Sequence, residues 1–418
     1  MKRLLPVLAF MLAPAAASAD IDLGEATAAL REASALCRQA PLWKRDLCGP
    51  MLIVDPATRQ VVANQAGPSL KLQGEVFVGV LPEGFPVANT AVDWEGVKWT
   101  MVMAGLPADR YDRAALLMHE AFHREQESLG FPMRSSAPDH LSTLEGRLLL
   151  RLEFRALAAA VTAKGEAARR LAIADALGFR AARRAQAGAG AEQEREQEIN
   201  EGLAEYTGRR MSGDPALDTR IAGLLAKAEA KPSFARSFAY GTGPAYGVLL
   251  DRYAPDWRAT ITGRDDLGAL LAAAVKVRPD PAAVDSAGAP YGYTSLRAEE
   301  TAAFVERDRQ AKVWTAKLVE GPVLRLPLQQ LQISFNPNQV FPLPPHGTAY
   351  PSLTLTETWG ALKVEGGGAL ISGDWSVLTL AAPAAGESNG DGWTLTLAPG
   401  WRFKPGDRPG DVTVVKAE

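Results

Sequence analysis

Residues 116–125 have the sequence LLMHEAFHRE, which contains two of the four histidines of this 418-residue chain. On an α-helix, His119 and His123 lie one turn apart, about 6 Å along the axis and on the same face, so both imidazoles can reach one cation. Glu120 lies about 100° further round the helix, where it can flank a metal ion without binding it and act as a general base. The HExxH pattern therefore predicts a zinc-binding helix.

The competing interpretation of this stretch is an amphipathic core helix with two ordinary buried histidines. Leu116, Met118 and Phe122 are apolar and favour burial of the helix. Two buried imidazoles beside a carboxylate need polar partners, because an unpaired buried polar group is costly. A metal ion provides such a partner, so we favour the metal site.

The first 19 residues have the pattern of a secretory signal peptide. Lys2 and Arg3 precede an apolar run at residues 4–13, and residues 17–19 read Ala-Ser-Ala, which predicts cleavage after Ala19. The apolar run is shorter than the about 20 residues that cross a bilayer, and no later stretch predicts a membrane helix. We therefore expect a periplasmic or secreted protein with no membrane span in its mature chain.

The composition indicates a globular protein of more than one domain. Hydrophobic residues make up 47% of the chain, and the net charge of -3 gives no basic surface for nucleic acid or anionic lipid. The only two cysteines, Cys37 and Cys48, would meet an oxidising compartment after export. We therefore expect them to form a disulfide rather than remain free thiols.

The order of predicted elements indicates an α+β fold. Residues 20–110 form an N-terminal subdomain, in which a helix at 25–38 precedes a small, mostly antiparallel sheet. The predicted strands of this sheet are residues 51–54, 60–64, 75–80, 88–94 and 97–103. Asp109 is placed to cap the motif helix, and Gly130 follows its end.

Residues 111–319 are predicted to be helical, with an inserted helical pair at about 141–187 and breaks at Gly165 and Gly178. A proline-rich stretch at 278–290 predicts a loop. From residue 321 to residue 418, short strands are separated by Gly, Pro and Asn. We expect a small β-sandwich or barrel there, with nothing in it that marks chemistry.

A second informative stretch, EINEGLAEY, occupies residues 198–206 of a helix predicted at 192–211. Glu194, Glu198, Glu201 and Glu205 share one face of that helix. Such a face is usually a solvated acidic stripe, and Glu194 and Glu198 fit that interpretation. Around Glu201 and Glu205, apolar neighbours indicate a packed helix, and Gly202 carries a helix-propensity cost of about 1 kcal/mol that close helix approach would explain.

The two stretches, HEAFH at 119–123 and NEGLA at 200–204, resemble the signature helices of the gluzincin metallopeptidases, the group of thermolysin and aminopeptidase N. The resemblance implies a zincin-like core, with His119, His123 and Glu201 as zinc ligands and Glu120 as the catalytic base. Glu205 matches the acidic residue that holds the first histidine of thermolysin-type enzymes from behind and fixes its tautomer.

The spacing of the two stretches departs from the family pattern. Seventy-seven residues separate His123 from Glu201, where the best-known members have about twenty. The inserted helical pair would account for the excess, since helices can leave and return to the same place. Glu145 lies at nearly the familiar spacing and is the alternative third ligand, unless it pairs with a nearby arginine. We favour Glu201.

Tyr240, in the sequence YGTG at 240–243, resembles the tyrosine of aminopeptidase N-like enzymes whose hydroxyl hydrogen-bonds the oxyanion. Tyr206 and Tyr246 compete for this role, and a packed tyrosine is the simpler explanation of each. Residues 101–105 lack the acidic residue that would bind a free substrate amine. This difference argues against aminopeptidase activity.

Taken together, the sequence predicts an exported zinc metallopeptidase that acts on a peptide or protein substrate with Zn²⁺ as its cofactor. Two alternatives use the same residues. One is a non-catalytic exported binding or envelope scaffold with a zincin fold, and the other is a zinc amidase that acts on cell-wall material. The remaining histidines, His140 and His346, are predicted as loop or surface residues.

Overall fold

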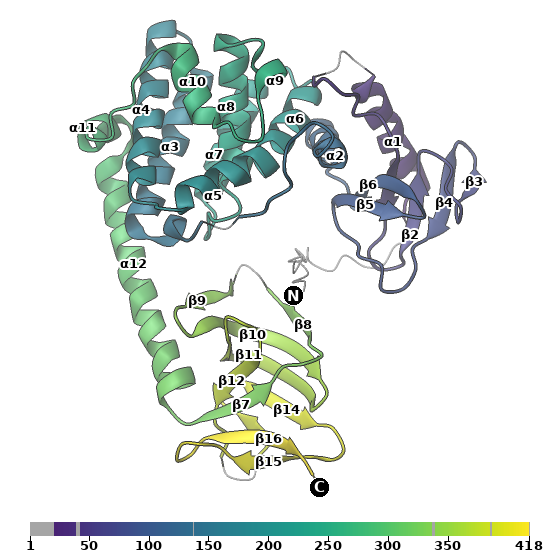
Figure 1. Cartoon of the computed structure of the whole chain (residues 1–418), viewed down its shortest axis with the longest axis vertical. Coiled ribbons are helices and arrows are strands. Elements are labelled where there is room, and N and C mark those ends of the chain that lie inside the picture. Colours follow the sequence, from purple (N-terminus) through teal and green to yellow (C-terminus); the bar gives the residue numbers. More distant parts are fainter. Residues whose placement is uncertain (1–20, 39–41, 137, 337–338, 385–386, 418) are drawn as a thin grey trace. The chain divides into compact units, whose positions relative to one another are not determined.

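The computed structural model describes residues 21–38, 42–136, 138–336, 339–384 and 387–417. The predicted signal peptide lies outside these described residues. The chain divides into two compact units, and the division falls inside the long helix α12 (Tyr293–Thr315): the first unit extends to Glu300, and the second begins at Thr301 (Figure 1). Each unit has its own hydrophobic core, and the predicted α+β class is confirmed.

The first unit begins with helix α1 (Leu23–Cys37) and a six-stranded mixed sheet in the order β3-β4-β2-β1-β6-β5. Only β1 and β6 run parallel; the other neighbouring strands of this sheet are antiparallel. The strands are β1 (Met51–Val54), β2 (Gln60–Ala63), β3 (Lys71–Gln73), β4 (Val76–Val80), β5 (Thr90–Trp94) and β6 (Val97–Met103). All five predicted strands are present within two residues of their predicted ends.

Side chains alternate along these strands, so the sheet has two buried faces. Ile53 of β1 and Val102 of β6 join the main core, which includes α1 and α2 (Arg110–Glu125). Leu52 and Met101 point the other way into a separate cluster with Trp99. The alternation therefore fixes the face on which the motif helix packs.

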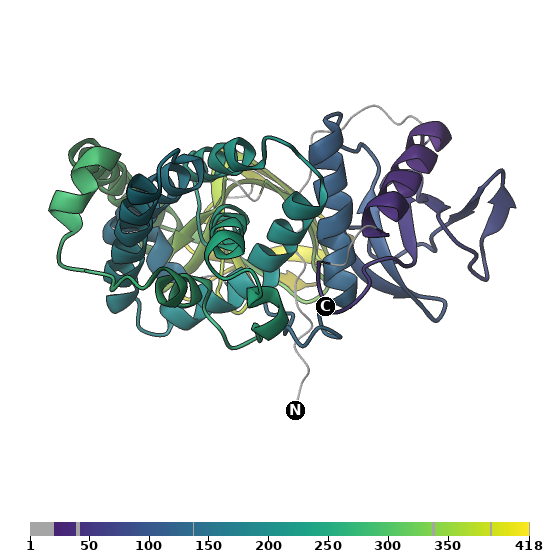
Figure 2. The same cartoon turned by 90° about the horizontal axis from the view of Figure 1, so that it is seen from above.

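Helix α2 begins where the sequence predicts. The carboxylate of Asp109 accepts hydrogen bonds from the backbone N–H groups of Tyr111 and Asp112, at 3.0 and 2.9 Å. Such caps satisfy backbone donors that the first helical turn leaves unpaired. The helix lies between the sheet with α1 on one side and the later helices of the unit on the other, as both views show (Figures 1 and 2).

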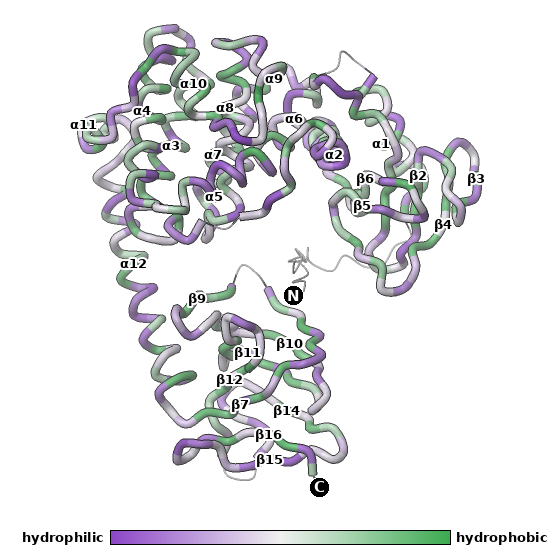
Figure 3. The backbone as a smooth tube through the Cα atoms, viewed as in Figure 1, coloured by the Kyte–Doolittle hydropathy of each residue, from purple (hydrophilic) through white to green (hydrophobic). Residues whose placement is uncertain are grey.

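The helices that follow α2 form the larger part of the first unit. They are α3 (Leu144–Thr162), α4 (Glu166–Ala185), α5 (Gly190–Gln197), the π-helical turn η2 (Glu198–Gly202), α6 (Leu203–Met211), α7 (Leu217–Glu229), α8 (Ala239–Tyr253), α9 (Trp257–Thr260), α10 (Leu267–Val275) and α11 (Val284–Gly288), with short turns η1 (Asp139–Ser142) and η3 (Ala289–Tyr291). The uncharged sequence of α10, LGALLAAAV, appears at the hydrophobic end of the colour scale in Figure 3.

Three local predictions need correction. Gly165 does precede α4, but Gly178 lies inside that helix, where a Cβ would come close to the carbonyl oxygen of Asp280. The glycine thus allows a loop to pack on the helix and does not break it. Residues 284–291, predicted as part of a loop, form α11 and η3, and the edge strand β3 was not predicted.

The second unit contains the rest of α12, the π-helical turn η4 (Ala316–Glu320) and a ten-stranded mixed sheet. Its strands are β7 (Val323–Pro327), β8 (Gln332–Phe335), β9 (Phe341–Leu343), β10 (Gly347–Glu357), β11 (Gly360–Ile371), β12 (Val377–Ala381), β13 (Asn389–Gly390), β14 (Trp393–Leu397), β15 (Trp401–Pro405) and β16 (Val412–Lys416). Their core surrounds Trp359, and His346 is exposed between β9 and β10. Within the described residues, every helix is too short or too polar to cross a bilayer.

Candidate metal centre

Helix α2 supplies both histidines of the candidate site. His119 and His123 are 4% and 7% exposed, and Glu120 is 5% exposed. Leu117 and Phe122, on other faces of the helix, are completely buried and hold it against its neighbours. The two imidazoles consequently have little freedom to move relative to one another.

The third predicted ligand comes from η2 and lies beside the histidines. His119 Nε2 and His123 Nε2 are 3.1 Å apart. Glu201 Oε2 lies 3.5 Å from His119 Nε2 and 3.4 Å from His123 Nε2. The structure therefore brings together the three side chains that the two sequence stretches predicted.

The spacing of these three atoms fits a zinc ion. Ligand atoms at the corners of a tetrahedron, about 2.0–2.1 Å from zinc, lie about 3.3–3.4 Å from one another. The observed separations of 3.1, 3.4 and 3.5 Å bracket that value. Two imidazole nitrogens and one carboxylate oxygen are also a donor set that zinc accepts in catalytic sites, where one position stays open.

The alternative ligand, Glu145, is not brought to this cluster. It lies at the start of α3, and its carboxylate accepts two hydrogen bonds from the guanidinium of Arg297, at 2.7 and 3.1 Å. Glu145 is thus paired with an arginine, although this is Arg297 of α12 and not one of the arginines near Glu145 in the sequence.

Each histidine is held from behind by an oxygen atom. His119 Nδ1 lies 3.0 Å from Glu205 Oε2, and His123 Nδ1 lies 2.7 Å from Gln126 Oε1. With Nδ1 as the donor in both rings, each Nε2 presents its lone pair to the ligand cluster. The side-chain nitrogen of Gln126 also donates to Asn200 Oδ1 at 2.9 Å, which connects α2 with η2.

Sequence reasoning predicted Glu205 in this role but missed Gln126. The available signal was its position three residues after His123, where a side chain shares a helix face. The identity of the residue alone did not distinguish it from other polar residues of the helix.

The charges of the cluster also favour a cation. Burial acts to raise the pKa of the Glu201 carboxyl, but hydrogen bonds with His119 and His123 outweigh it and hold that pKa well below its ordinary value. Burial acts to lower the pKa of His119, but hydrogen bonds with Glu201 and Glu205 raise it well above its ordinary value. The carboxylates of Glu120, Glu201 and Glu205 thus lie around two imidazoles. Arg209 pairs with Glu205, and a divalent ion would balance the remaining negative charge.

A cavity of about 230 Å³ adjoins this cluster, and Tyr240 is one of the residues that line it. The Tyr240 hydroxyl donates to Glu201 Oε2 at 2.6 Å, and its ring stacks on His119 with a centroid distance of 5.7 Å. Burial, followed by the nearby charge of Glu201, raises the pKa of Tyr240, so its hydroxyl remains a proton donor. Further lining residues come from the start of β5 and from the segment after α2: Asn89, Thr90, Met133 and Ser135.

The two competing tyrosines lie elsewhere in the unit. Tyr206 donates to Asp251 at 2.8 Å, and Tyr246 donates to Glu153 at 2.6 Å; both rings are fully buried. Of the three candidates, only Tyr240 lines the cavity within the described part of the chain.

Close backbone approach positions η2 against α8. A Cβ added to Gly243 would overlap the backbone of Gly202, so the two helices touch at a pair of glycines. The expectation that Gly202 permits close helix packing is therefore confirmed. The π-helical geometry of residues 198–202 places Glu201 in a single widened turn, a feature frequently found at functional sites.

The prediction that Glu194 and Glu198 are solvated is wrong. Both are completely buried, and arginines of the inserted helix α4 bind them. Arg180 Nη1 donates to Glu198 Oε1 at 2.8 Å, and Arg183 Nε donates to Glu194 Oε1 at 2.7 Å. His140, predicted on the surface, has Nε2 only 2.6 Å from Glu194 Oε1. The acidic face of the ligand helix is thus packed against the insertion over its first half.

The predicted disulfide is present between Cys37, the last residue of α1, and Cys48, with their Cα atoms 5.2 Å apart. Asp46, beside the disulfide, accepts a hydrogen bond from the Cys48 N–H at 2.8 Å. Since both cysteines are bonded to each other, neither is available as a metal ligand.

No protein-family model, no curated protein and no solved structure matches this chain. The interpretation of the site therefore rests on its own geometry.

Proposed function

We propose that this protein is an exported zinc-dependent metallopeptidase of the gluzincin type, with a zincin-like core in which His119, His123 and Glu201 hold the metal. The observation that carries the proposal is the set of mutual distances, 3.1–3.5 Å, among the three ligand atoms. Export is supported by the disulfide, because such bonds persist in oxidising compartments.

Zinc in a site of this kind, when bound, polarises a substrate carbonyl and lowers the pKa of a water molecule from about 15.7 toward about 7. Glu120 is the residue that takes up the proton of the attacking water. Its Oε2 is buried without a hydrogen-bond partner, and burial, the largest cause, raises the pKa of its carboxyl. A carboxylate with a raised pKa accepts a proton more readily and can pass it to the leaving nitrogen.

Tyr240 is the residue that hydrogen-bonds the carbonyl oxygen as it becomes negative. Its hydroxyl lines the cavity and, in the structure, donates to Glu201 Oε2. A small rotation of the phenol would redirect this donor toward a substrate oxygen. Donors of this type typically contribute about 3 kcal/mol to transition-state stabilisation.

A peptide substrate is supported by the position of β5. This strand ends the sheet, and within the described residues it pairs only with β6. Thr90, its first residue, lines the cavity. The unpaired edge of β5 offers backbone donors and acceptors to an extended chain, which favours peptide over cell-wall glycan as the bound material.

The test is metal content combined with hydrolysis of a denatured protein mixture, with and without a chelator. We expect purified wild-type protein to hold stoichiometric zinc and to lose hydrolysis with the chelator. Glu120→Gln should retain zinc and lose turnover by roughly 10²–10⁴-fold. His123→Ala should lose zinc. Zinc-loaded wild type with no hydrolysis of any peptide would support the scaffold alternative, and equal activity in all three proteins would contradict the proposed site.

A further inference from the structure

The loop closed by the disulfide lies against α2, which carries both histidines, and against α6, which follows directly after Glu201 and η2. Its described residues, 42–48, are here called the disulfide loop. Trp43 is the buried centre of this loop, with only 4% of its surface exposed. Nothing in the proposed chemistry uses Trp43, so its burial calls for another explanation.

Trp43 contacts α2 at the residue before His123, and it contacts α6, the helix that continues directly from η2. On α2, its ring lies 5.5 Å from that of Phe122, the residue before His123. On α6, its ring lies 6.4 Å from that of Tyr206, and its Nε1 donates to Thr207 Oγ1 at 2.9 Å. One side chain thus bridges the two helices by aromatic packing on one and a hydrogen bond on the other.

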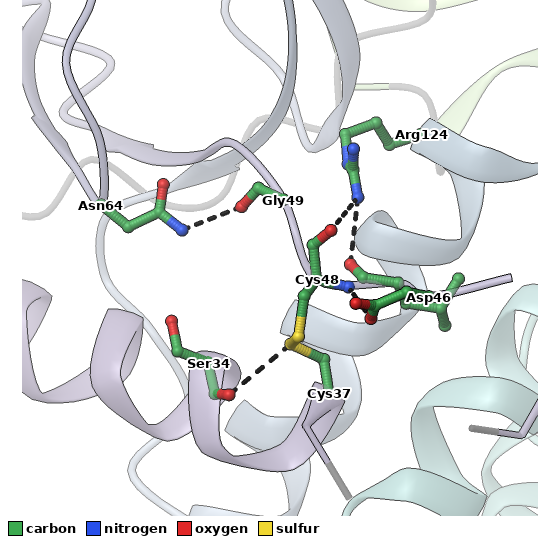
Figure 4. Close-up of a disulfide and its surroundings, with 8 residues drawn as sticks. Ser34, Cys37, Asp46, Cys48, Gly49, Asn64 and Arg124 are labelled. Atoms are coloured by element: carbon green, nitrogen blue, oxygen red, sulfur yellow. Dashed lines mark hydrogen bonds between the residues drawn. A yellow bond between two sulfur atoms is a disulfide. The ribbon is translucent and has the colours of Figure 1, made fainter. Parts of the chain in front are cut away.

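Arg124, the residue after His123, fastens the other end of the disulfide loop. Its Nη2 donates to the carbonyl oxygens of Leu47 and Cys48 at 3.0 and 3.1 Å (Figure 4). The guanidinium is buried, and a Cβ added to Gly49 would overlap it. The loop carbonyls are therefore fitted to an arginine on the ligand helix.

Elsewhere, α2 and α6 already touch directly. A Cβ added to Gly208 of α6 would overlap the carbonyl of Ala115 on α2. This backbone contact limits the separation of the helices at one point along their length. Trp43 contacts α2 at Phe122 and α6 at Thr207, so it adds a second constraint on the separation of the two helices.

We infer that Trp43 is a positioning residue for the metal centre and that the Cys37–Cys48 disulfide holds it in place. The inference rests on the proposed function, since it assigns the disulfide loop to the same three ligands. Metal ligands tolerate little displacement, because the bond lengths of a zinc site vary by only about 0.2 Å. When Trp43 is no longer held between them, α2 and α6 can shift, and the distance between the two histidines and Glu201 increases.

Two sets of variants weaken the contacts of Trp43 or open the disulfide loop, without creating a large cavity. Trp43→Phe removes the N–H donor but keeps an aromatic ring. Thr207→Val removes the acceptor, together with the bond that its hydroxyl donates to the Leu203 carbonyl within α6. Cys37→Ser with Cys48→Ser opens the loop and introduces no thiol that could itself bind zinc. The matched control is Trp99→Phe: Trp99 is equally buried, donates to a backbone carbonyl and belongs to the other face of the sheet.

Zinc affinity is measured by competition with a chromophoric chelator, and the global unfolding free energy is measured alongside it. We expect Trp43→Phe and the double serine variant to bind zinc roughly ten- to a hundredfold more weakly than wild type, as loss of a residue supporting metal ligands does. Thr207→Val should change affinity in the same direction but less. Trp99→Phe should lose stability without a change in zinc affinity.

Hydrogen exchange of metal-free protein separates this inference from the proposed function. We expect faster exchange at residues 116–125 and 198–206 in Trp43→Phe than in Trp99→Phe at equal global stability. Zinc affinity and exchange that match wild type in both Trp43→Phe and the double serine variant would overturn the positioning role. Wild-type protein that binds no zinc would contradict the proposed function, and the exchange comparison alone would then decide the role of Trp43.

Discussion

Replacing Glu205 by glutamine tests the support behind His119 with a change of one atom. Glu205 uses one oxygen for His119 Nδ1, at 3.0 Å, and the other for Arg209 Nε, at 2.7 Å. Both partners are donors, so the amide group of glutamine can satisfy only one of them. A buried donor left without its acceptor costs about 1–3 kcal/mol.

This cost predicts the change in zinc affinity. If the glutamine oxygen bonds Arg209, His119 loses its fixed tautomer; if it bonds His119, the negative charge that strengthens the imidazole as a ligand is lost. In either case zinc should bind roughly 10–100-fold more weakly, equivalent to about 1.4–2.7 kcal/mol.

The matched control is Asp112→Asn, because Asp112 is the other carboxylate bound to Arg209 but its contacts are with arginines. Affinity is measured by chelator competition at pH 7, and thermal unfolding of the metal-free proteins checks the fold. Glu205→Gln with wild-type zinc affinity would refute the supporting role. Equal losses in the two variants would show that the charge of Arg209, and not the bond to His119, is responsible.

Three further predictions concern other parts of the first unit. Tyr240→Phe should lower kcat by roughly a hundredfold, the typical effect of losing one oxyanion donor, and leave zinc content unchanged; equal kcat would remove Tyr240 from the mechanism. Arg183→Met should destabilise the protein by about 3–5 kcal/mol in urea unfolding, because it removes a buried cation that binds both Glu194 and Glu153 and leaves these carboxylates only their other partners; a change below 1 kcal/mol would contradict this. Burial acts to raise the pKa of Glu194, but Arg183 and His140 outweigh it and hold that pKa well below 4.5. The Glu194 carboxylate therefore stabilises the fold fully above about pH 4.5, and this contribution decreases as the pH falls toward the folded pKa. In urea titrations, the unfolding free energy of metal-free wild type should consequently fall more steeply below about pH 4.5 than that of Arg183→Met.

The parts of the fold that sequence predicted are those encoded by local patterns. The apolar run of β1 and the Asp109 cap depend on neighbouring residues, and the disulfide depends on there being only two cysteines to pair. The strand β3 was missed because it has only three residues, Lys71, Leu72 and Gln73, and all three are exposed. Such a strand exists because β4 supplies its hydrogen bonds, which no local pattern records.

In the candidate site, the sequence predicted the three clustered side chains and Glu205 behind His119, but not the other residues that hold them in place. Helical periodicity shows that Glu194 and Glu198 share a face with Glu201, but it does not show what that face meets. The arginines that bind these two glutamates, Arg180 and Arg183, lie on α4, which belongs to the inserted helical pair. The role of Trp43 was unpredictable for the same reason, because its contacts span distant segments that meet only in the folded chain.

The glycine pair Gly202 and Gly243 restricts how the cavity can open. Because the two backbones are in direct contact, a sliding motion of η2 along α8 would cause a steric collision. We therefore expect Glu201 of η2 and Tyr240 of α8 to move together. Room for an entering substrate has to come from the opposite wall, where β5 and the segment around Met133 border the cavity. A motion that widens the cavity for the proposed peptide substrate should therefore involve β5 and the segment around Met133.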